Sequence, residues 1–184
     1  MKLLKIFLLI FVVSLASCND GNKDAETDDK TAELSAEEQS TDMSDKLMSI
    51  NDDLFTAWNN NDKELMASHL AEDFTRFANG ENDLNGRDAY LSMMDSLHTS
   101  FPDLSIIEKE TTSTGNQTFG SFTFKGTNNG KFLGNPATGK EVSVEGFAIW
   151  TFNDQRKATK EQVYFDRMTW LSQMGYVTTP PEVK

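Results

Sequence analysis

The stretch that decides the fold opens with Phe101-Pro102-Asp103-Leu104 and closes with Tyr164-Phe165-Asp166-Arg167. Within it, apolar and polar residues alternate with the period of two that β-strands impose on their side chains. The alternation predicts four strands, at residues 104–113, 117–127, 141–153 and 158–166. Turn residues and a loop at 128–140 separate these strands. Consecutive strands joined in this way predict an antiparallel sheet.

Ahead of Pro102, apolar residues recur every three or four positions, which is the spacing of amphipathic helices. The pattern predicts a first helix that begins at Asp42 or Ser44, and further helices at residues 63–70 and 88–100. Pro102 ends the last of these. A strand at 73–78 and a helical turn at 170–174 complete the prediction. Helices followed by a run of strands indicate an α+β domain, which we place at residues 43–177, with a C-terminal tail at 178–184.

The N-terminus has the pattern of a bacterial signal peptide. Its apolar run, residues 6–16, is too short for a membrane span of roughly 20 residues. The run ends Leu15-Ala16-Ser17-Cys18, which resembles a lipobox and holds the only cysteine in the chain. We therefore expect residues 1–17 to be removed and Cys18 to carry acyl chains such as palmitate, which anchor the protein to a membrane. The alternative is a secretory peptide that ends near a buried cysteine.

The segment behind Cys18 is acidic. Residues 19–42 contain nine acids, two lysines and no aromatic residue. Such a segment buries too little apolar area to offset its ordering entropy, so we expect residues 18–42 to form the lipidated cysteine and a disordered tether. Acids close behind a lipidated cysteine also resemble surface-export signals of some lipoproteins. The expected location is the cell envelope, with the outer membrane favoured and exposure on the cell surface left open.

Composition excludes several other classes of function. The formal net charge is −12, and no cluster of Lys and Arg of useful size is present, so we expect no nucleic-acid partner. The sequence has no Cys/His spacing for zinc and no glycine-rich phosphate loop, so we expect neither a metal nor a cofactor. Its two histidines, His69 and His98, fall on predicted helices.

Several short motifs, taken in order, resemble the SnoaL-like polyketide cyclase (ester cyclase) family of the nuclear-transport-factor-2-like superfamily. They are Gly86-Arg87, Phe101-Pro102-Asp103-Leu104, Phe132-Leu133-Gly134 with Thr138-Gly139, and Asp166-Arg167 followed by Leu171, Gln173, Met174 and Gly175. The resemblance covers residues 55–175. It implies a cone-shaped α+β barrel, in which a bent antiparallel sheet carries helices on its concave face.

The resemblance also implies a site. In this family an aspartate at the place of Asp166 is the general acid and base of an intramolecular aldol closure that uses no cofactor. If Gln162, Tyr164 and Asp166 face the cone, burial raises the pKa of Asp166 toward the range useful for proton transfer. Alternatively, Asp166 pairs with Arg167 or caps the last helical turn. The chain departs from the family at Phe77, where cyclases usually have a histidine, and at Gln162, where they often have a tryptophan.

Aromatic side chains are spread over the elements that meet in a cone, and each of them buries roughly 150–250 Å². We predict that a subset lines a pocket for a flat, apolar ligand. The predicted lining is Trp58, Phe74, Phe77, Tyr90, Phe122, Phe124, Phe147, Gln162 and Tyr164. The face of the 141–153 strand opposite Phe147 is apolar as well, and we expect that face to point outward and to be covered in a homodimer. Its residues are Val142, Val144, Ala148, Trp150 and Phe152. The alternative is that the C-terminal tail covers this face.

Two hypotheses for function follow. In the first, a membrane-anchored lipoprotein binds a small, largely apolar molecule in the cone, with cyclase- or isomerase-like acid/base chemistry at Asp166. In the second, the cone is filled by Phe77 and its neighbours, and the domain is a non-catalytic interaction module that acts through its sheet surface. The volume inside the cone discriminates between the two hypotheses.

Overall fold

The computed structural model describes residues 25–176, with side chains described from Ser40 onward. The predicted signal peptide, Cys18 and the tail at 178–184 lie outside the described residues. The described helices are α1 (Ala25–Asn60), α2 (Lys63–His69), α3 (Arg87–Ser100) and α4 (Arg167–Gln173). The strands are β1 (Leu70–Ala78), β2 (Glu81–Asn85), β3 (Ser105–Thr114), β4 (Gln117–Thr127), β5 (Glu141–Phe152) and β6 (Ala158–Phe165).

Helix α1 begins well before its predicted start at Asp42 or Ser44. It includes residues 25–42, which the sequence predicted to be disordered, so the structure corrects that part of the tether prediction. The segment is rich in alanine and glutamate and contains neither proline nor glycine. These residue types are good helix formers, which lets the helix continue upstream of the part that packs on the sheet.

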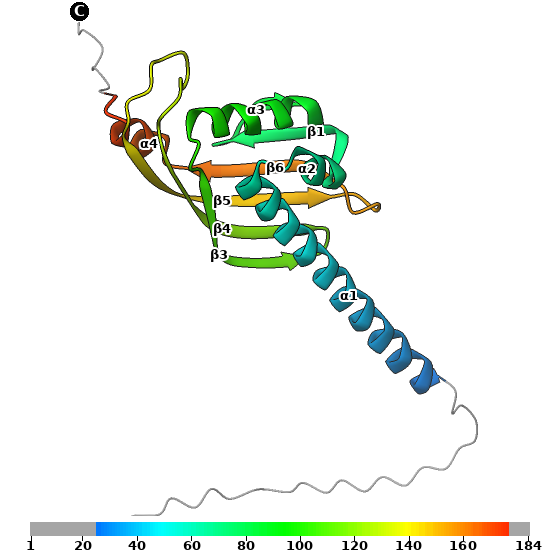
Figure 1. The fold of residues 1–184 in the computed structure, drawn as a ribbon. Coiled ribbons are helices and arrows are strands. Elements are labelled where there is room, and N and C mark those ends of the chain that lie inside the picture. Colours follow the sequence, from blue (N-terminus) through cyan, green and yellow to red (C-terminus); the bar gives the residue numbers. More distant parts are fainter. Residues whose placement is uncertain (1–24, 177–184) are drawn as a thin grey trace, which may run out of the picture. The chain divides into compact units, whose positions relative to one another are not determined.

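The six strands form one sheet in the order β2-β1-β6-β5-β4-β3. The neighbours pair antiparallel as predicted, apart from β1 and β6, which run parallel. A parallel pair needs a crossover connection. Here the chain leaves β1, forms the rest of the sheet and α3, and returns as β6 beside β1 (Figure 1). Strands far apart in sequence are thereby brought into register.

The short edge strand β2 was not predicted. The turn signal Asn79-Gly80 does mark the turn between β1 and β2, and both residues have positive φ angles, 53° and 87°. Asparagine and glycine are the residues that most readily adopt this conformation. The strand reads Glu81-Asn82-Asp83-Leu84-Asn85 and lies at the edge of the sheet, where most of its residues are exposed. With one apolar residue it shows no alternation of apolar and polar side chains, so the sequence pattern did not predict it.

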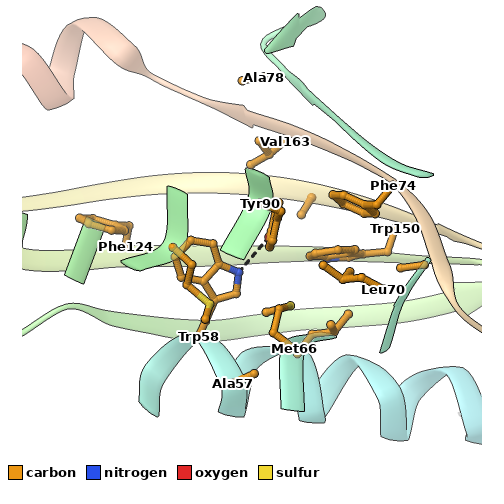
Figure 2. Packing of buried hydrophobic residues seen from close by; sticks show 14 of the residues in the cluster. Ala57, Trp58, Met66, Leu70, Phe74, Ala78, Tyr90, Phe124, Trp150 and Val163 are labelled. Carbon is orange, nitrogen blue, oxygen red and sulfur yellow. Dashed lines mark hydrogen bonds between the residues drawn. The ribbon is translucent and has the colours of Figure 1, made fainter. Parts of the chain in front are cut away.

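The hydrophobic core lies between the helices and one face of the sheet. Trp58 of α1, Tyr90 of α3, Phe74 of β1 and Trp150 of β5 meet there (Figure 2), with ring centroids 5.0–6.1 Å apart in the contacting pairs. Phe74 and Tyr90 are fully buried. Edge-to-face contacts such as those of Tyr90 stabilise aromatic clusters beyond the area that they bury. The cluster holds α1 and α3 against the sheet.

The structure reverses the predicted faces of β5 and β6. On β5, the set that contains Trp150 is buried beneath the helices, whereas Phe147 on the other face is 41 % exposed. On β6, Glu161 and Val163 are buried and Tyr164 is 41 % exposed. The physical reason is that the more apolar set of each strand takes the face that the helices cover.

Candidate functional site

A cavity of about 80 Å³ lies between the helices and the inner face of the sheet. The cone is therefore open, and Phe77 does not fill it. Apart from one acid and one base, the side chains around the cavity are hydrophobic. They are Leu54, Phe55, Trp58, Arg76, Leu97, Ile106, Phe122, Phe124, Val144, Ala148, Trp150, Glu161, Val163, Phe165 and Trp170. A water needs about 10–15 Å³ of such space, so the cavity has room for a small group of atoms.

The charged lining residues form an ion pair. Arg76 of β1 and Glu161 of β6 are register partners on the parallel pair of strands. The Arg76 Nε–H donates to Glu161 Oε2 at 2.9 Å, and both side chains are largely buried, at 13 % and 8 % exposed. Arg76 also binds Asp83 of β2 through Nη1. The guanidinium thus holds one carboxylate at the cavity and a second one nearer the surface.

Tyr90 extends this polar group into the core. Trp58 Nε1–H donates to the Tyr90 hydroxyl oxygen at 3.0 Å (Figure 2). Tyr90 is also hydrogen-bonded to Glu161. Because the hydroxyl oxygen accepts from Trp58, the Tyr90 O–H is left to donate to the Glu161 carboxylate. Trp58, Tyr90, Glu161 and Arg76 form a hydrogen-bonded chain from α1 to β1, which we call the Glu161 network.

Burial decides the protonation behaviour of the Glu161 network. Desolvation raises the pKa of Glu161 above its ordinary value, and the positive charge of Arg76 opposes that rise without cancelling it. Desolvation also raises the pKa of Tyr90 well above its ordinary value, with the negative charge of Glu161 adding to the effect. For Arg76, desolvation lowers the pKa, but the attraction of Glu161, Tyr90 and Asp83 outweighs it and the pKa is raised. Glu161 therefore holds its proton more tightly than an exposed glutamate does.

Asp166 lies outside the cavity. It is exposed and caps α4, accepting from the Thr169 backbone N–H at 2.9 Å and from the Thr169 hydroxyl at 2.6 Å. The hydrogen bonds from Thr169 lower the pKa of Asp166. This is the capping role that the sequence left open as the alternative. Its chemistry is the reverse of that expected for a buried acid, whose pKa burial raises.

The structure brings together only part of the predicted pocket. Trp58, Phe122 and Phe124 line the cavity. Phe74 and Tyr90 are buried in the core and pack against Trp58 or Trp150, which line it. The other four predicted residues lie on the outer face of the sheet or are partly exposed there. They are Phe77, Phe147, Gln162 and Tyr164.

Sequence reasoning missed Glu161, although a signal for it is present. Residues that alternate along a strand share a face, and Glu161 alternates with Val163 and Phe165. The opposite set has Gln162, Tyr164 and Asp166. The more apolar set is the one expected in the core, which would have directed Glu161 inward. Arg76 alternates with Phe74 and Ala78 on β1 in the same way.

A second, outer pocket of about 460 Å³ adjoins the cavity. The two share Arg76, Leu97, Phe165 and Trp170 as lining residues. The outer pocket is more polar, since Asp83, Lys131 and Arg167 also border it. The cavity and the outer pocket therefore meet along the wall that carries Arg76 and Trp170.

Neither metal ligation nor membrane spanning is supported by the described part of the chain. Residues 40–176 contain no group of three or more His, Cys, Asp or Glu side chains placed to hold a metal ion. No helix among the described residues is long and apolar enough to cross a bilayer. Within the same residues, His69 binds Asp53, and His98 binds the backbone carbonyl of Trp58.

Solved structures with the same fold cover most of the domain. A protein from Jannaschia sp. CCS1 assigned as a SnoaL-like polyketide cyclase is 16 % identical, with a TM-score of 0.68, over 74 % of this chain and 96 % of its own. A protein from Xanthomonas campestris pv. campestris assigned as a polyketide cyclase is 20 % identical, with a TM-score of 0.65, over 72 % and 99 %. AclR from Streptomyces galilaeus, assigned as a hydroxylase, is 20 % identical, with a TM-score of 0.64, over 72 % and 98 %.

These likenesses establish the cone fold that the motifs predicted. At such low sequence identity they show only that the fold is shared. The activities assigned to these neighbours also differ from one another. No curated protein matches the chain in sequence. The family model of the SnoaL-like polyketide cyclases matches residues 50–174, which is more than half of the chain. The chain therefore belongs to the SnoaL-like polyketide cyclase family.

Proposed function

We propose that this chain binds a small, largely apolar molecule in the cone. The observation that carries the proposal is the open cavity, whose lining is hydrophobic except for Arg76 and Glu161. Apolar walls with a few placed polar groups are characteristic of small-molecule sites. The alternative, a filled cone that acts only through its outer surface, is less well supported because Phe77 lies away from the cavity.

A filling variant tests binding. The probe is 2-tetralone, a flat, neutral and mostly apolar ketone, and binding to the full chain is measured by isothermal titration calorimetry. Ala148 is 7 % exposed and lines the cavity, so Ala148→Leu places extra carbon atoms in the space that the probe needs. Ser143→Leu adds a comparable side chain on the exposed face of the same strand and is the control. Saturable binding that Ala148→Leu abolishes and Ser143→Leu retains supports the proposal, whereas equal binding by both variants contradicts it.

Acid/base chemistry in the cone is a second candidate function, and Glu161 is its best-placed residue. Its carboxylate borders the apolar cavity, and burial raises its pKa toward the range in which a carboxylate exchanges protons efficiently. Arg76 beside it supplies hydrogen-bond donors and positive charge for a developing enolate oxygen. Asp166 was expected in this role, but its exposed position on α4 favours a capping function.

Exchange of hydrogen for deuterium at carbon tests this candidate. In deuterated water, a base that removes a proton from the α-carbon of 2-tetralone leaves an enolate, and return of a deuteron labels that carbon. Glu161→Gln is expected to lower the protein-dependent exchange rate by about 10²–10⁴-fold. Asp166→Asn is expected to leave the rate unchanged. Equal loss in both variants, or in neither, contradicts the assignment of Glu161 as the base.

Lipid attachment and self-association are two further properties that we propose for the whole protein. We propose that Cys18 carries lipid and holds the domain on a membrane of the cell envelope, on the grounds of the signal-peptide pattern and the lipobox-like sequence. We also propose that the chain forms a homodimer. The exposed apolar side chains Phe147, Tyr164 and Ile107 on the outer face of the sheet support this.

A further inference from the structure

The outer pocket contains cations that the fold leaves without a counter-charge. Three basic side chains border the pocket, namely Arg76, Lys131 and Arg167, against a single acid, Asp83. Arg76 is bound to both Asp83 and Glu161. Lys131 and Arg167 form no ion pair with any acid in the described part of the chain. Lys131 and Arg167 thus add two positive charges to the mouth of an apolar cavity in a chain whose net charge is −12.

The backbone that carries Lys131 is fixed beside the pocket. The Ser100 hydroxyl donates to the Lys131 carbonyl at 2.6 Å, and the Ser100 carbonyl accepts from the Gly130 N–H at 3.0 Å. A Cβ atom at position 130 would lie only 2.1 Å from the Thr99 carbonyl oxygen, so only glycine fits there. The loop is thus seated on the end of α3, and Lys131 is held at the rim.

Arg167 and Trp170 border the outer pocket from helix α4. Both belong to α4, whose first turn is capped by Asp166. Trp170 stacks on Phe132, with ring centroids 5.6 Å apart and planes 12° apart. The Trp170 indole N–H is buried and has no hydrogen-bond acceptor among the described residues. A buried donor without a partner is costly, and Trp170 lines both the cavity and the outer pocket.

We infer that the ligand of this cone is an amphipathic anion, whose apolar body enters the cavity and whose carboxylate lies in the outer pocket between Lys131 and Arg167. The inference rests on the proposed function, because it needs an apolar body bound in the cone. The two spaces adjoin, with about 80 Å³ in the cavity and about 460 Å³ in the outer pocket. Charged groups bound by Lys and Arg form stronger hydrogen bonds than neutral groups do.

The arrangement of charge also determines the direction of the ligand. In the cavity the charges of Arg76 and Glu161 offset each other, whereas Lys131 and Arg167 add positive charge that attracts a carboxylate at the mouth. An amphipathic anion therefore has one favourable orientation in the cone, with its charged end in the outer pocket. A neutral molecule of the same shape lacks this preference and gains nothing from the two cations.

A matched pair of probes tests the inference. The anion 2-naphthoate and the neutral 2-naphthamide share one ring system and differ in the carboxylate. Calorimetric titration of the full chain is expected to show that 2-naphthoate binds more tightly than 2-naphthamide. Added salt is expected to lower the affinity for 2-naphthoate only. The double variant Lys131→Gln/Arg167→Gln is expected to lower the affinity for 2-naphthoate by about five- to tenfold and to leave that for 2-naphthamide unchanged.

The control variant is Lys125→Gln/Arg156→Gln. It removes one lysine and one arginine that border neither space and form no ion pair with the described acids, so its change in net charge is the same. Equal affinity for both probes, or a preference for 2-naphthoate that survives in the double variant, overturns the anion inference and leaves binding in the cone intact. Failure of the wild type to bind either naphthalene probe or 2-tetralone overturns the proposed function and the inference together.

Discussion

Arg76 Nε–H donates to Glu161 Oε2 at 2.9 Å, and this bond joins β1 to β6 across 85 positions of sequence. The two residues are register partners on strands that run parallel, and both side chains are largely buried. A buried ion pair repays the desolvation of its charges only when both partners are present and hydrogen-bonded. The pair therefore makes the wall of the cavity sensitive to the loss of either residue.

Removal of Arg76 alone is expected to be severe. Arg76→Met leaves the buried Glu161 without its counter-charge, which is expected to lower the free energy of unfolding by about 3–5 kcal/mol. The double variant Arg76→Met/Glu161→Gln removes both charges and keeps an acceptor for Tyr90, so at least half of the loss is expected to return. Chemical denaturation of the single and double variants measures both values. Additive losses would show that the two side chains do not interact energetically.

The pH dependence of stability separates Glu161 from Asp166. Burial raises the folded-state pKa of Glu161, so its contribution to stability is fully present below its unfolded-state pKa and is lost as the pH rises through the folded value. Hydrogen bonds from Thr169 lower the pKa of Asp166, so its contribution is present above the unfolded-state pKa and is lost as the pH falls through the folded value.

Two variants test these opposite pH dependences of stability. The difference in unfolding free energy between wild type and Glu161→Gln is expected to shrink as the pH rises from acid toward neutral. The difference between wild type and Asp166→Asn is expected to grow over the same range. Denaturant titrations at a series of pH values give both curves. Parallel curves would contradict the distinct environments that the structure assigns to the two acids.

Gly146 keeps the cavity open by leaving room for the Phe122 ring. A Cβ atom at position 146 would lie 2.4 Å from Phe122 Cζ and under 3.0 Å from both Cε atoms, so the ring has to move. Phe122 lines the cavity, and Gly146→Ala is therefore expected to push the ring into it and to weaken 2-tetralone binding by about tenfold. Titration calorimetry measures the affinity.

A second substitution makes the Gly146 prediction specific. Phe122→Leu shortens the displaced side chain, so Gly146→Ala/Phe122→Leu is expected to recover most of the lost affinity. Ser121→Ala, on the opposite face of β4, serves as the control and is expected to bind as wild type does. Unaltered binding by Gly146→Ala would show that Phe122 can move without closing the cavity.

The strands and most helices were predictable because their apolar period is strongly marked. Strand β4 falls at residues 117–127, as the alternation predicted, and α3 begins one residue before its predicted start. The upstream extension of α1 was not predictable from apolar periodicity, because the helix there depends on backbone propensity. The parallel pairing of β1 with β6 was missed because sequence order alone favours neighbours along the chain.

The candidate site was harder to predict for two physical reasons. On β5 the set that contains Trp150 is the more apolar, but Phe147 and Ile149 on the other face drew the predicted pocket to the wrong side of the strand. The resemblance then drew attention to Asp166, whose spacing from Thr169 is equally that of a helix cap. Glu161 is buried beside Arg76, which is far from it in the sequence. The two residues meet only because β1 pairs with β6 in the folded chain.

Membrane attachment is expected to depend on Cys18 alone. Acyl chains on one residue contribute about 0.8 kcal/mol for each buried CH₂ group, which is enough for stable anchoring when two or more chains are present. Cys18→Ser removes the thiol that accepts the lipid, so the variant is expected in the soluble fraction after cell breakage, while wild type sediments with membranes. Asp20→Asn, two residues later, is the control and is expected to sediment as well. Sedimentation of Cys18→Ser with membranes would contradict the lipobox interpretation.

Dimerisation is expected to use the outer face of the sheet. Phe147 and Tyr164 are cross-strand partners there, and each is 41 % exposed, while Ile107 on β3 is 43 % exposed. Such a surface is self-complementary in a two-fold dimer, since the same apolar residues meet from both copies. Phe147→Glu is expected to convert a dimeric wild type into a folded monomer, as measured by light scattering and circular dichroism. Trp150→Glu on the buried face is expected to unfold the chain instead, and a monomeric wild type would rule out the dimer.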